Sequence, residues 1–335
     1  MHVDIHAHVI PRPYLERVRR GDVPGVRIEV GDAGGEVMSV AGGGPTGPVA
    51  QRLALAPGYH DARARVAEMD AASVDVHVLS PLQFLFHYWI DAKAAAELAR
   101  LVNDGIAEMV GERPDRFVGM ATLPLQDIGA AVGELERVHR DLGLRAVEIG
   151  THVAGTSLDA PALDQFWARA EALETLIFVH PYAPLGADRL GAYFLRNILG
   201  NPFETALAMS HLLLGGVLER FPGLRLCFAH GGGAMPYVIG RLERGFDVSP
   251  ACRAKAAERP AAALGRVYYD TIVHDAPALE YLIARVGASR VLLGSDYPFD
   301  IGDPDPVRTV EKLGIDRGAK RAILGGNAAA LLHLG

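Results

Sequence analysis

Short apolar runs rich in β-branched residues recur along the chain and alternate with longer amphipathic segments. The longer segments carry apolar residues at a spacing near 3.6, as in 93–109 and 128–142, which indicates helices. Alternating strands and helices favour a parallel sheet, and eight such units in 335 residues favour a closed (β/α)8 barrel of the TIM type. The eight predicted strands are Val3–His8, Val74–Pro81, Phe117–Leu125, Ala146–His152, Leu176–Tyr182, Leu224–His230, Val267–Asp275 and Val291–Pro298.

Two segments interrupt this repeat. Residues 21–58 are rich in Gly, Pro and Val and contain the run Gly42-Gly43-Gly44-Pro45. This composition predicts an inserted β-hairpin or flap between the first strand and its helix, over the top face of the barrel. A second irregular stretch, 183–203, follows the fifth strand. We find no low-complexity linker in the sequence, so we expect one domain spanning residues 1–335.

Composition and charge narrow the class of protein. Hydrophobic residues make up 50% of the chain and charged residues 22%, which is typical of a globular protein with a large core. A net charge of −7 without a Lys/Arg run argues against a nucleic-acid partner. The sequence shows neither a signal-peptide pattern nor an apolar stretch of transmembrane length, so we expect a cytoplasmic enzyme without a membrane partner. The first strand lacks a following G-x-G-x-x-G, which makes a dinucleotide-binding fold a poor alternative.

Histidine and aspartate side chains stand where four of the predicted strands end. His6 and His8 end the first strand, His180 the fifth, His230 the sixth and Asp296 the eighth. Alternation along a strand puts His6 and His8 on one face, and barrel enzymes build their active sites at the carboxyl ends of the strands. A single histidine at a strand end is more often a hydrogen-bonded core residue. The agreement of all five positions with the independent strand count therefore favours a functional site.

The chemistry of these side chains predicts a metal centre. Three neutral imidazoles and one carboxylate suit Zn²⁺, and Mn²⁺, Fe²⁺ or Co²⁺ are alternatives. A site with two metals usually needs a bridging group, often a carbamylated lysine at the end of the fourth strand. The chain has no lysine between Lys93 and Lys255, so we expect one divalent metal ion.

Several motifs resemble the decarboxylating branch of the amidohydrolase superfamily, which is typified by 2-amino-3-carboxymuconate-6-semialdehyde decarboxylase. The similarity covers nearly the whole chain and is highly specific for the branch. The motifs are VDIHAHVIP at 3–11, ARARVAEMDAASVDV at 62–76, VEIGTHV at 147–153, FVHP at 178–181, CFAHGGGAMPYVIGR at 227–241, LLGSDYPF at 292–299 and GNAAALL at 326–332.

The resemblance implies roles for the residues at the strand ends. It identifies His6, His8, His180 and Asp296 as the metal ligands. His230 would form a hydrogen bond with the metal-bound water and act, together with Asp296, as the acid or base.

The resemblance also implies how substrate is bound. Arg241, eleven residues after His230, would reach the substrate carboxylate of a neighbouring subunit, which implies a homodimer. Arg52 is the candidate for a second carboxylate-binding arginine, offset by about one position from the family's own. Two pocket loops depart from the family pattern: Tyr182-Ala183-Pro184 stands where Trp-Asp-Met is usual, and SPLQFLFHYW at 80–89 replaces a Pro-Val-Met-Phe pattern.

These features predict a metal-dependent nonoxidative decarboxylase, a carbon–carbon lyase that acts on a small unsaturated or aromatic carboxylate. The alternative within the same superfamily is a hydrolase or hydratase that acts on a lactone, an amide or a double bond. Fold and metal ligands do not distinguish these reactions. A barrel without catalytic activity would be expected to have lost a ligand, and this chain retains all of them.

Overall fold

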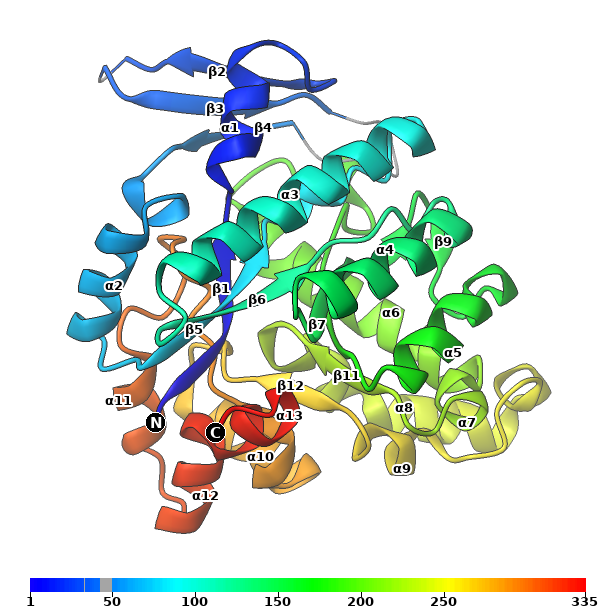
Figure 1. Cartoon of the computed structure of the whole chain (residues 1–335). Coiled ribbons are helices and arrows are strands. Elements are labelled where there is room, and N and C mark those ends of the chain that lie inside the picture. Colours follow the sequence, from blue (N-terminus) through cyan, green and yellow to red (C-terminus); the bar gives the residue numbers. More distant parts are fainter. Residues whose placement is uncertain (33, 43–49) are drawn as a thin grey trace.

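The computed structural model describes residues 1–32, 34–42 and 50–335, and within them the chain forms a (β/α)8 barrel (Figure 1). Its parallel strands neighbour one another in chain order. The barrel strands are β1 (Val3–Val9), β5 (Val76–Pro81), β6 (Phe117–Ala121), β7 (Ala146–Gly150), β10 (Leu176–His180), β11 (Arg225–Phe228), β12 (Tyr268–Asp270) and β13 (Val291–Leu292).

The first and last strands meet, which closes the barrel. Ile5 donates its backbone N–H to the carbonyl of Leu293 at 2.8 Å, and Asp296 donates to the carbonyl of His6 at 2.9 Å. All eight predicted strands are confirmed, but most end earlier than expected. The residues beyond each ladder leave the sheet as loops, and these loops carry much of the polar chemistry at the carboxyl ends.

The helices surround the barrel, and several begin at an aspartate whose side chain accepts hydrogen bonds from the first turn, as Asp91 does at α3. In α3, buried residues recur every three or four positions from Ala95 to Met109. The α-helices are α1 (Arg12–Arg19), α2 (Ala62–Ala71), α3 (Ala92–Glu112), α4 (Ile128–Asp141), α5 (Asp164–Ala172), α6 (Asn201–Leu214), α7 (Val217–Arg220), α8 (Met235–Val248), α9 (Pro260–Leu264), α10 (Ala276–Val286), α11 (Pro306–Glu311), α12 (Arg317–Arg321) and α13 (Asn327–Leu332).

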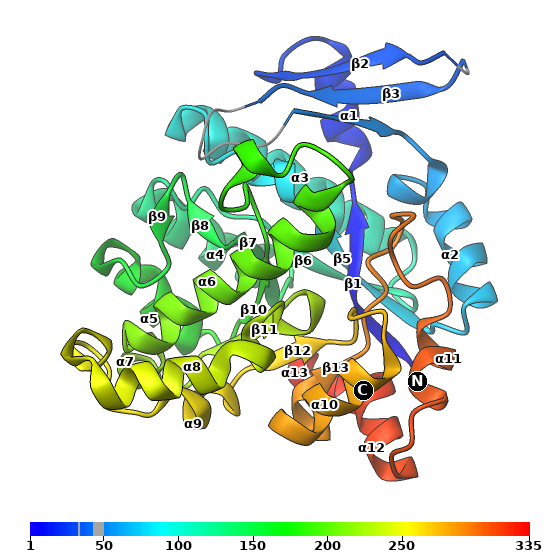
Figure 2. The same cartoon turned by 180° about the vertical axis from the view of Figure 1, so that it is seen from behind.

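Seen from behind, α6 and α8 lie side by side near β10 and β11 (Figure 2). The chain between β10 and α6, predicted to be irregular, contains only a 3₁₀ turn (Ala187–Arg189) and one π-helical turn (Arg196–Gly200). Within the described residues, none of the helices is both long enough and apolar enough to cross a membrane.

The insertion differs from the predicted hairpin. Helix α1 follows β1 first, and the insertion then forms a three-stranded antiparallel sheet of β2 (Val26–Val30), β3 (Glu36–Val40) and β4 (Gln51–Ala54). The sheet lies beside α1 at the top of Figure 1, beyond the carboxyl end of β1. The prediction missed β4 because this strand is short and largely exposed, and so lacks a clear apolar alternation. Of the run 42–45, residues 43–45 lie outside the described residues.

The interior of the barrel is apolar at its amino end and polar at its carboxyl end. The register of β1 against β5 shifts between Asp4 and Ala7. An apolar cluster fills the inside of the barrel and includes Val3, Ile5 and Phe178; we call it the inner cluster. The ring of His6 lies against Phe178 of this cluster. A bulge of this kind redirects side chains. Because of the shift, Val3 and Ile5 as well as His6 and His8 of the same strand can face the interior of the barrel.

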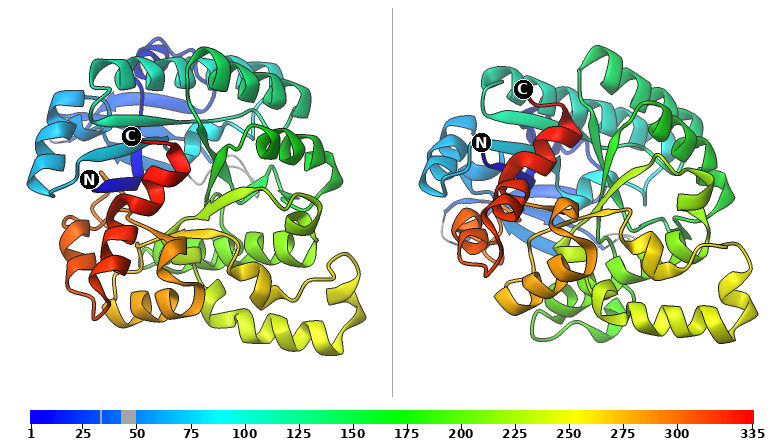
Figure 3. Two further views of the ribbon diagram at one scale, coloured as in Figure 1. Left: turned by 60° about the horizontal axis from the view of Figure 1, so that its bottom comes forward. Right: turned by 90° about the horizontal axis from the view of Figure 1, so that it is seen from below.

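Helix α13 closes the amino end of the barrel. Ala328, Leu331 and Leu332 pack in the inner cluster with residues at the starts of the strands, such as Val3 and Leu176. The view from below shows this helix crossing the barrel, with both termini nearby (Figure 3). The polar site described next is therefore reached from the opposite end.

Candidate metal centre

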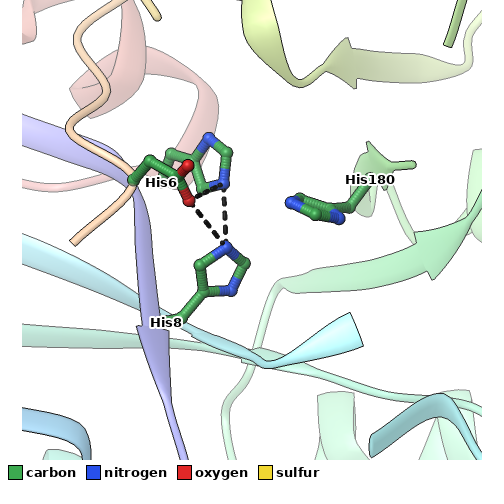
Figure 4. Close-up of side chains that lie close together, drawn as sticks. His6, His8 and His180 are labelled. Carbon is green, nitrogen blue, oxygen red and sulfur yellow. Dashed lines mark hydrogen bonds and ion pairs between the residues drawn. The ribbon is translucent and has the colours of Figure 1, made fainter. Parts of the chain in front are cut away.

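Four side chains converge at the carboxyl end of the barrel. His6 and His8 come from β1, His180 from the last position of β10, and Asp296 from the loop after β13. One ligand atom from each lies within 4.8 Å of every other, and all four residues are buried. In Figure 4 the imidazoles of His6 and His8 approach each other, and His180 faces them across the site. The structure therefore brings together the four predicted ligands.

The atoms of this cluster are arranged as metal ligands are. The Nε2 atoms of His6 and His8 lie 2.9 Å apart, and they lie 3.3 and 3.2 Å from Oδ1 of Asp296. Within the described residues, that oxygen is buried and has no hydrogen-bond donor with good geometry. Lone pairs of nitrogen and oxygen thus point at one place, and such a set fits a divalent cation.

The electrostatics of the site favour positive charge. Burial opposes a charge on His6, but Asp296 and Asp270 outweigh it and raise the pKa of His6 well above its usual value. Burial lowers the pKa of His8 to about 4 and that of His180 well below normal, so both imidazoles are neutral near pH 7. Burial also opposes the charge of Asp296, but His6 holds its pKa well below the usual range. His8, His180 and Asp296 are therefore already in the forms that bind a metal ion, whereas His6 would release its proton on binding.

A second carboxylate, which the sequence prediction missed, orients this cluster. Asp270 at the end of β12 accepts a hydrogen bond from Nδ1 of His6 at 2.7 Å. It also accepts from the backbone N–H groups of His230 at 3.0 Å and Gly231 at 2.8 Å. A carboxylate behind a ligand histidine fixes the ring and makes it a better ligand. The prediction missed it because Asp270 falls inside the seventh predicted strand, Val267–Asp275, whereas the observed strand β12 ends there.

His230 stands beside the four ligands at the edge of a cavity. Its Nε2 lies 3.8 Å from Oδ2 of Asp296, and its side chain is 15% exposed. Both residues line a cavity of about 400 Å³ whose other walls are mostly apolar. Both also have left-handed backbones, with φ of 57° at His230 and 60° at Asp296. Such conformations are costly for residues other than glycine, and they are concentrated at functional sites.

The structure does not bring the two predicted arginines to this cluster. Arg52 lies on β4, and its guanidinium pairs with Glu29 at 3.1 Å, with both side chains at least half exposed. Arg241 lies on the exposed side of α8. Neither residue lines the cavity beside His230.

Comparisons with known proteins agree with the fold. The family described as "Amidohydrolase" matches residues 3–334. Among curated proteins, 2-amino-3-carboxymuconate-6-semialdehyde decarboxylase of Dictyostelium discoideum is 39% identical over 276 residues, which cover 82% of this chain and 77% of that protein.

Solved structures share the whole architecture. The crystal structure of 5-carboxyvanillate decarboxylase from Sphingomonas paucimobilis has a TM-score of 0.81 at 26% identity, covering 100% of this chain and 99% of that one. The dihydroxybenzoic acid decarboxylase of Polaromonas sp. JS666, solved with bound manganese and an inhibitor, has a TM-score of 0.80 at 24% identity, covering 99% and 97%. This chain therefore belongs to the amidohydrolase family, in the branch that contains these decarboxylases.

Proposed function

We propose that this protein is a metal-dependent nonoxidative decarboxylase, a carbon–carbon lyase that acts on an unsaturated or aromatic carboxylate. The observation that carries the proposal is the geometry of His230. It stands next to a buried set of metal ligands and opens into a cavity with apolar walls. The relatives named above are decarboxylases of carboxylates with unsaturated or aromatic skeletons.

The metal would be held by His6, His8, His180 and Asp296. Zn²⁺ is the proposed ion, because three imidazoles and one carboxylate suit it. Mn²⁺ is the first alternative to test, because the Polaromonas enzyme was solved with manganese. When bound, a divalent cation holds a carboxylate and stabilises negative charge on its oxygens.

The side chains of this protein would do the rest of the chemistry. His230, with Asp296 beside it, is placed to deliver a proton to the carbon that bears the carboxylate. Protonation makes that carbon skeleton an electron sink. The bond to the carboxylate then breaks, its electron pair returns to the unsaturated skeleton, and CO2 departs. The net change replaces the carboxylate by the proton, without any organic cofactor.

We also propose that the protein acts as a cytoplasmic homodimer. Large apolar side chains are exposed on the chain before and within α6 and on α8, among them Tyr193, Phe194, Phe203 and Tyr237. Exposed apolar patches of this kind are typical of protein interfaces. A dimer formed through this face would bring Arg241 of one copy towards the neighbouring site, and its mass in solution tests this.

The function is tested by CO2 release from a panel of acids. Protein loaded with Zn²⁺ or Mn²⁺ would be given 2-amino-3-carboxymuconate semialdehyde, salicylates and resorcylates. We expect CO2 from at least one acid with wild type and none with His230→Ala. Metal content must be equal in the two proteins, and His139→Ala, on the outer helix α4, serves as the matched control. Failure of every acid despite one bound metal per chain would favour a hydrolase or hydratase.

A further inference from the structure

One fully buried arginine, Arg65 of α2, forms no hydrogen bond with a carboxylate among the described residues. Its guanidinium donates instead to two backbone carbonyls and to one imidazole. Burial lowers the pKa of Arg65 to about 10, so the group is still charged near pH 7. Burying a charge without an ionic partner is costly. The groups that Arg65 contacts therefore indicate why the chain keeps it there.

These contacts join two segments that carry metal ligands. Nη2 of Arg65 donates to the carbonyl of the ligand His8, and to that of Gly58, the last residue of the insertion, at 2.8 Å. The guanidinium carbon lies 4.6 Å from the centre of the Tyr297 ring, and Tyr297 directly follows the ligand Asp296. The backbone N–H of His8 donates to the carbonyl of Tyr297 at 2.6 Å. Arg65 thus lies where the backbones of two ligand segments meet.

A buried carboxylate, Asp4, joins the same two segments at another point. It accepts a hydrogen bond from the backbone N–H of the ligand His6 at 2.9 Å. It also accepts from the backbone N–H of Ser295 at 3.1 Å and from the hydroxyl of Ser295. Because Ser295 directly precedes Asp296, this contact fixes the loop that supplies the ligand carboxylate.

His77 of β5 connects Arg65 with Asp4. Burial lowers the pKa of His77 well below its usual value, so the ring is neutral near pH 7. A guanidinium only donates, so Nδ1 of His77 accepts from Nη1 of Arg65 at 3.2 Å and the ring proton is on Nε2. That Nε2 lies 3.4 Å from Oδ2 of Asp4. The three side chains therefore form one continuous Arg65–His77–Asp4 network.

We propose that the Arg65–His77–Asp4 network positions three of the four metal ligands, and so determines the metal affinity and the coordination geometry of the site. It contacts the ligands, or the residues next to them, away from the atoms that would bind the metal. Its members are therefore positioning residues. This inference rests on the ligands of the proposed function, but not on the reaction that follows. The ligands concerned are His6, His8 and Asp296.

The test observes the metal centre directly, with Co²⁺ as the probe. The visible absorption of bound Co²⁺ depends on the arrangement of its ligands, and competition with a chelator gives its affinity. We expect Arg65→Lys to change the spectrum and to weaken binding about tenfold, the lower end of the range for residues that orient ligands. Lysine keeps the charge but lacks the planar set of donors. Arg65→Met removes the charge as well and should weaken binding further.

Arg116→Met is the matched control. The side chain of Arg116 is 17% exposed and donates to the carbonyls of Asp75 and Val74, before β5 begins and at the opposite end of the barrel from the metal centre. This change should lower the melting temperature and leave the Co²⁺ spectrum and affinity as in wild type. The proposal is overturned if the Arg65 variants bind Co²⁺ as wild type does, or if Arg116→Met alters the spectrum as they do.

Asp4→Asn tests the other end of the network at almost unchanged volume. If the network acts as one unit, Arg65→Lys and Asp4→Asn combined should weaken Co²⁺ binding by less than the product of their separate effects. Effects that simply multiply would mean that the two residues act independently, and the network would be rejected. This pair also keeps the test available if Arg65→Met does not fold.

Failure of the network and failure of the function give different results. If Arg65→Lys changes the Co²⁺ spectrum but no acid releases CO2 from wild type, the network stands and the decarboxylase proposal fails. If acids release CO2 but the Co²⁺ spectrum and affinity are the same in every variant, the decarboxylase stands and the network fails.

Discussion

The metal centre and the β2–β4 sheet each contain a basic side chain paired with a carboxylate, but the first pair is buried and the second is exposed. At the metal centre, His6 and Asp270 form a contact of 2.7 Å with both side chains fully buried. In the sheet, Arg52 and Glu29 form a contact of 3.1 Å with side chains 62% and 50% exposed. Water screens the second pair, whereas the first has only protein around it. Burial, more than distance, should therefore decide what each contact contributes.

The largest effect is expected when a ligand at the buried site is changed. Asp296→Asn removes the only carboxylate of the ligand set at almost unchanged volume. We expect metal affinity to fall more than about a hundredfold, beyond the 10–100-fold typical of residues behind the ligands. Elemental analysis of the purified variant checks this. Added metal should also raise the melting temperature of wild type and leave that of the variant unchanged.

A smaller effect is expected when the residue that hydrogen-bonds a ligand histidine is changed. Asp270→Asn keeps the shape but removes the charge that faces His6, so metal affinity should fall about 10–100-fold. Competition with a metal chelator measures the affinity. Asp159→Asn, which removes a charge paired with His211 and Lys255 on the outside of the barrel, should leave it unchanged. Equal affinity in the Asp270 variant would show that the buried contact does not support the metal.

Burial also predicts a pH dependence away from the metal. Burial lowers the pKa of His87 to about 4, and Tyr14 lies 3.0 Å from its Nε2. Unfolded His87 has the usual pKa near 6.5 and takes up a proton first as the pH falls. Its contribution to stability is therefore lost between pH 6.5 and 4, at up to about 1.4 kcal/mol per pH unit.

His87→Asn tests this, because asparagine tolerates the left-handed backbone at this position, where φ is 52°. Urea unfolding at pH 6.5 and pH 5 should show a smaller loss of stability in the variant than in wild type. An unchanged loss would mean that His87 does not carry the effect.

The smallest effect is expected in the exposed sheet. Arg52→Gln should lower the free energy of unfolding by less than about 1 kcal/mol, because its partner Glu29 is also half exposed. Its KM for the substrate should stay unchanged, because Arg52 pairs with Glu29 and does not line the cavity beside His230. A tenfold rise in KM for Arg52→Gln would instead restore the role that the family resemblance implied for this arginine.

The main features of the fold and of the metal centre could be predicted from the sequence. The recurrence of apolar strands along the chain, and the positions where they end, were enough to place His6, His8, His180 and Asp296 at one end of a barrel. The contact between Asp270 and His6 could not be predicted, because it joins residues 264 positions apart. Local patterns carry no signal for such a contact, for the bulge in β1, or for a cavity that depends on how separate loops pack.

Helix α13, which closes the amino end of the barrel, has a consequence for the order of events in a reaction. Because Ala328, Leu331 and Leu332 fill that end, we expect substrate, proton and CO2 to share the opening at the carboxyl end. A gas molecule can pass a larger molecule that still occupies the opening, whereas the reverse is harder. We therefore expect CO2 to leave first, so that escape of the organic product determines when the next substrate enters.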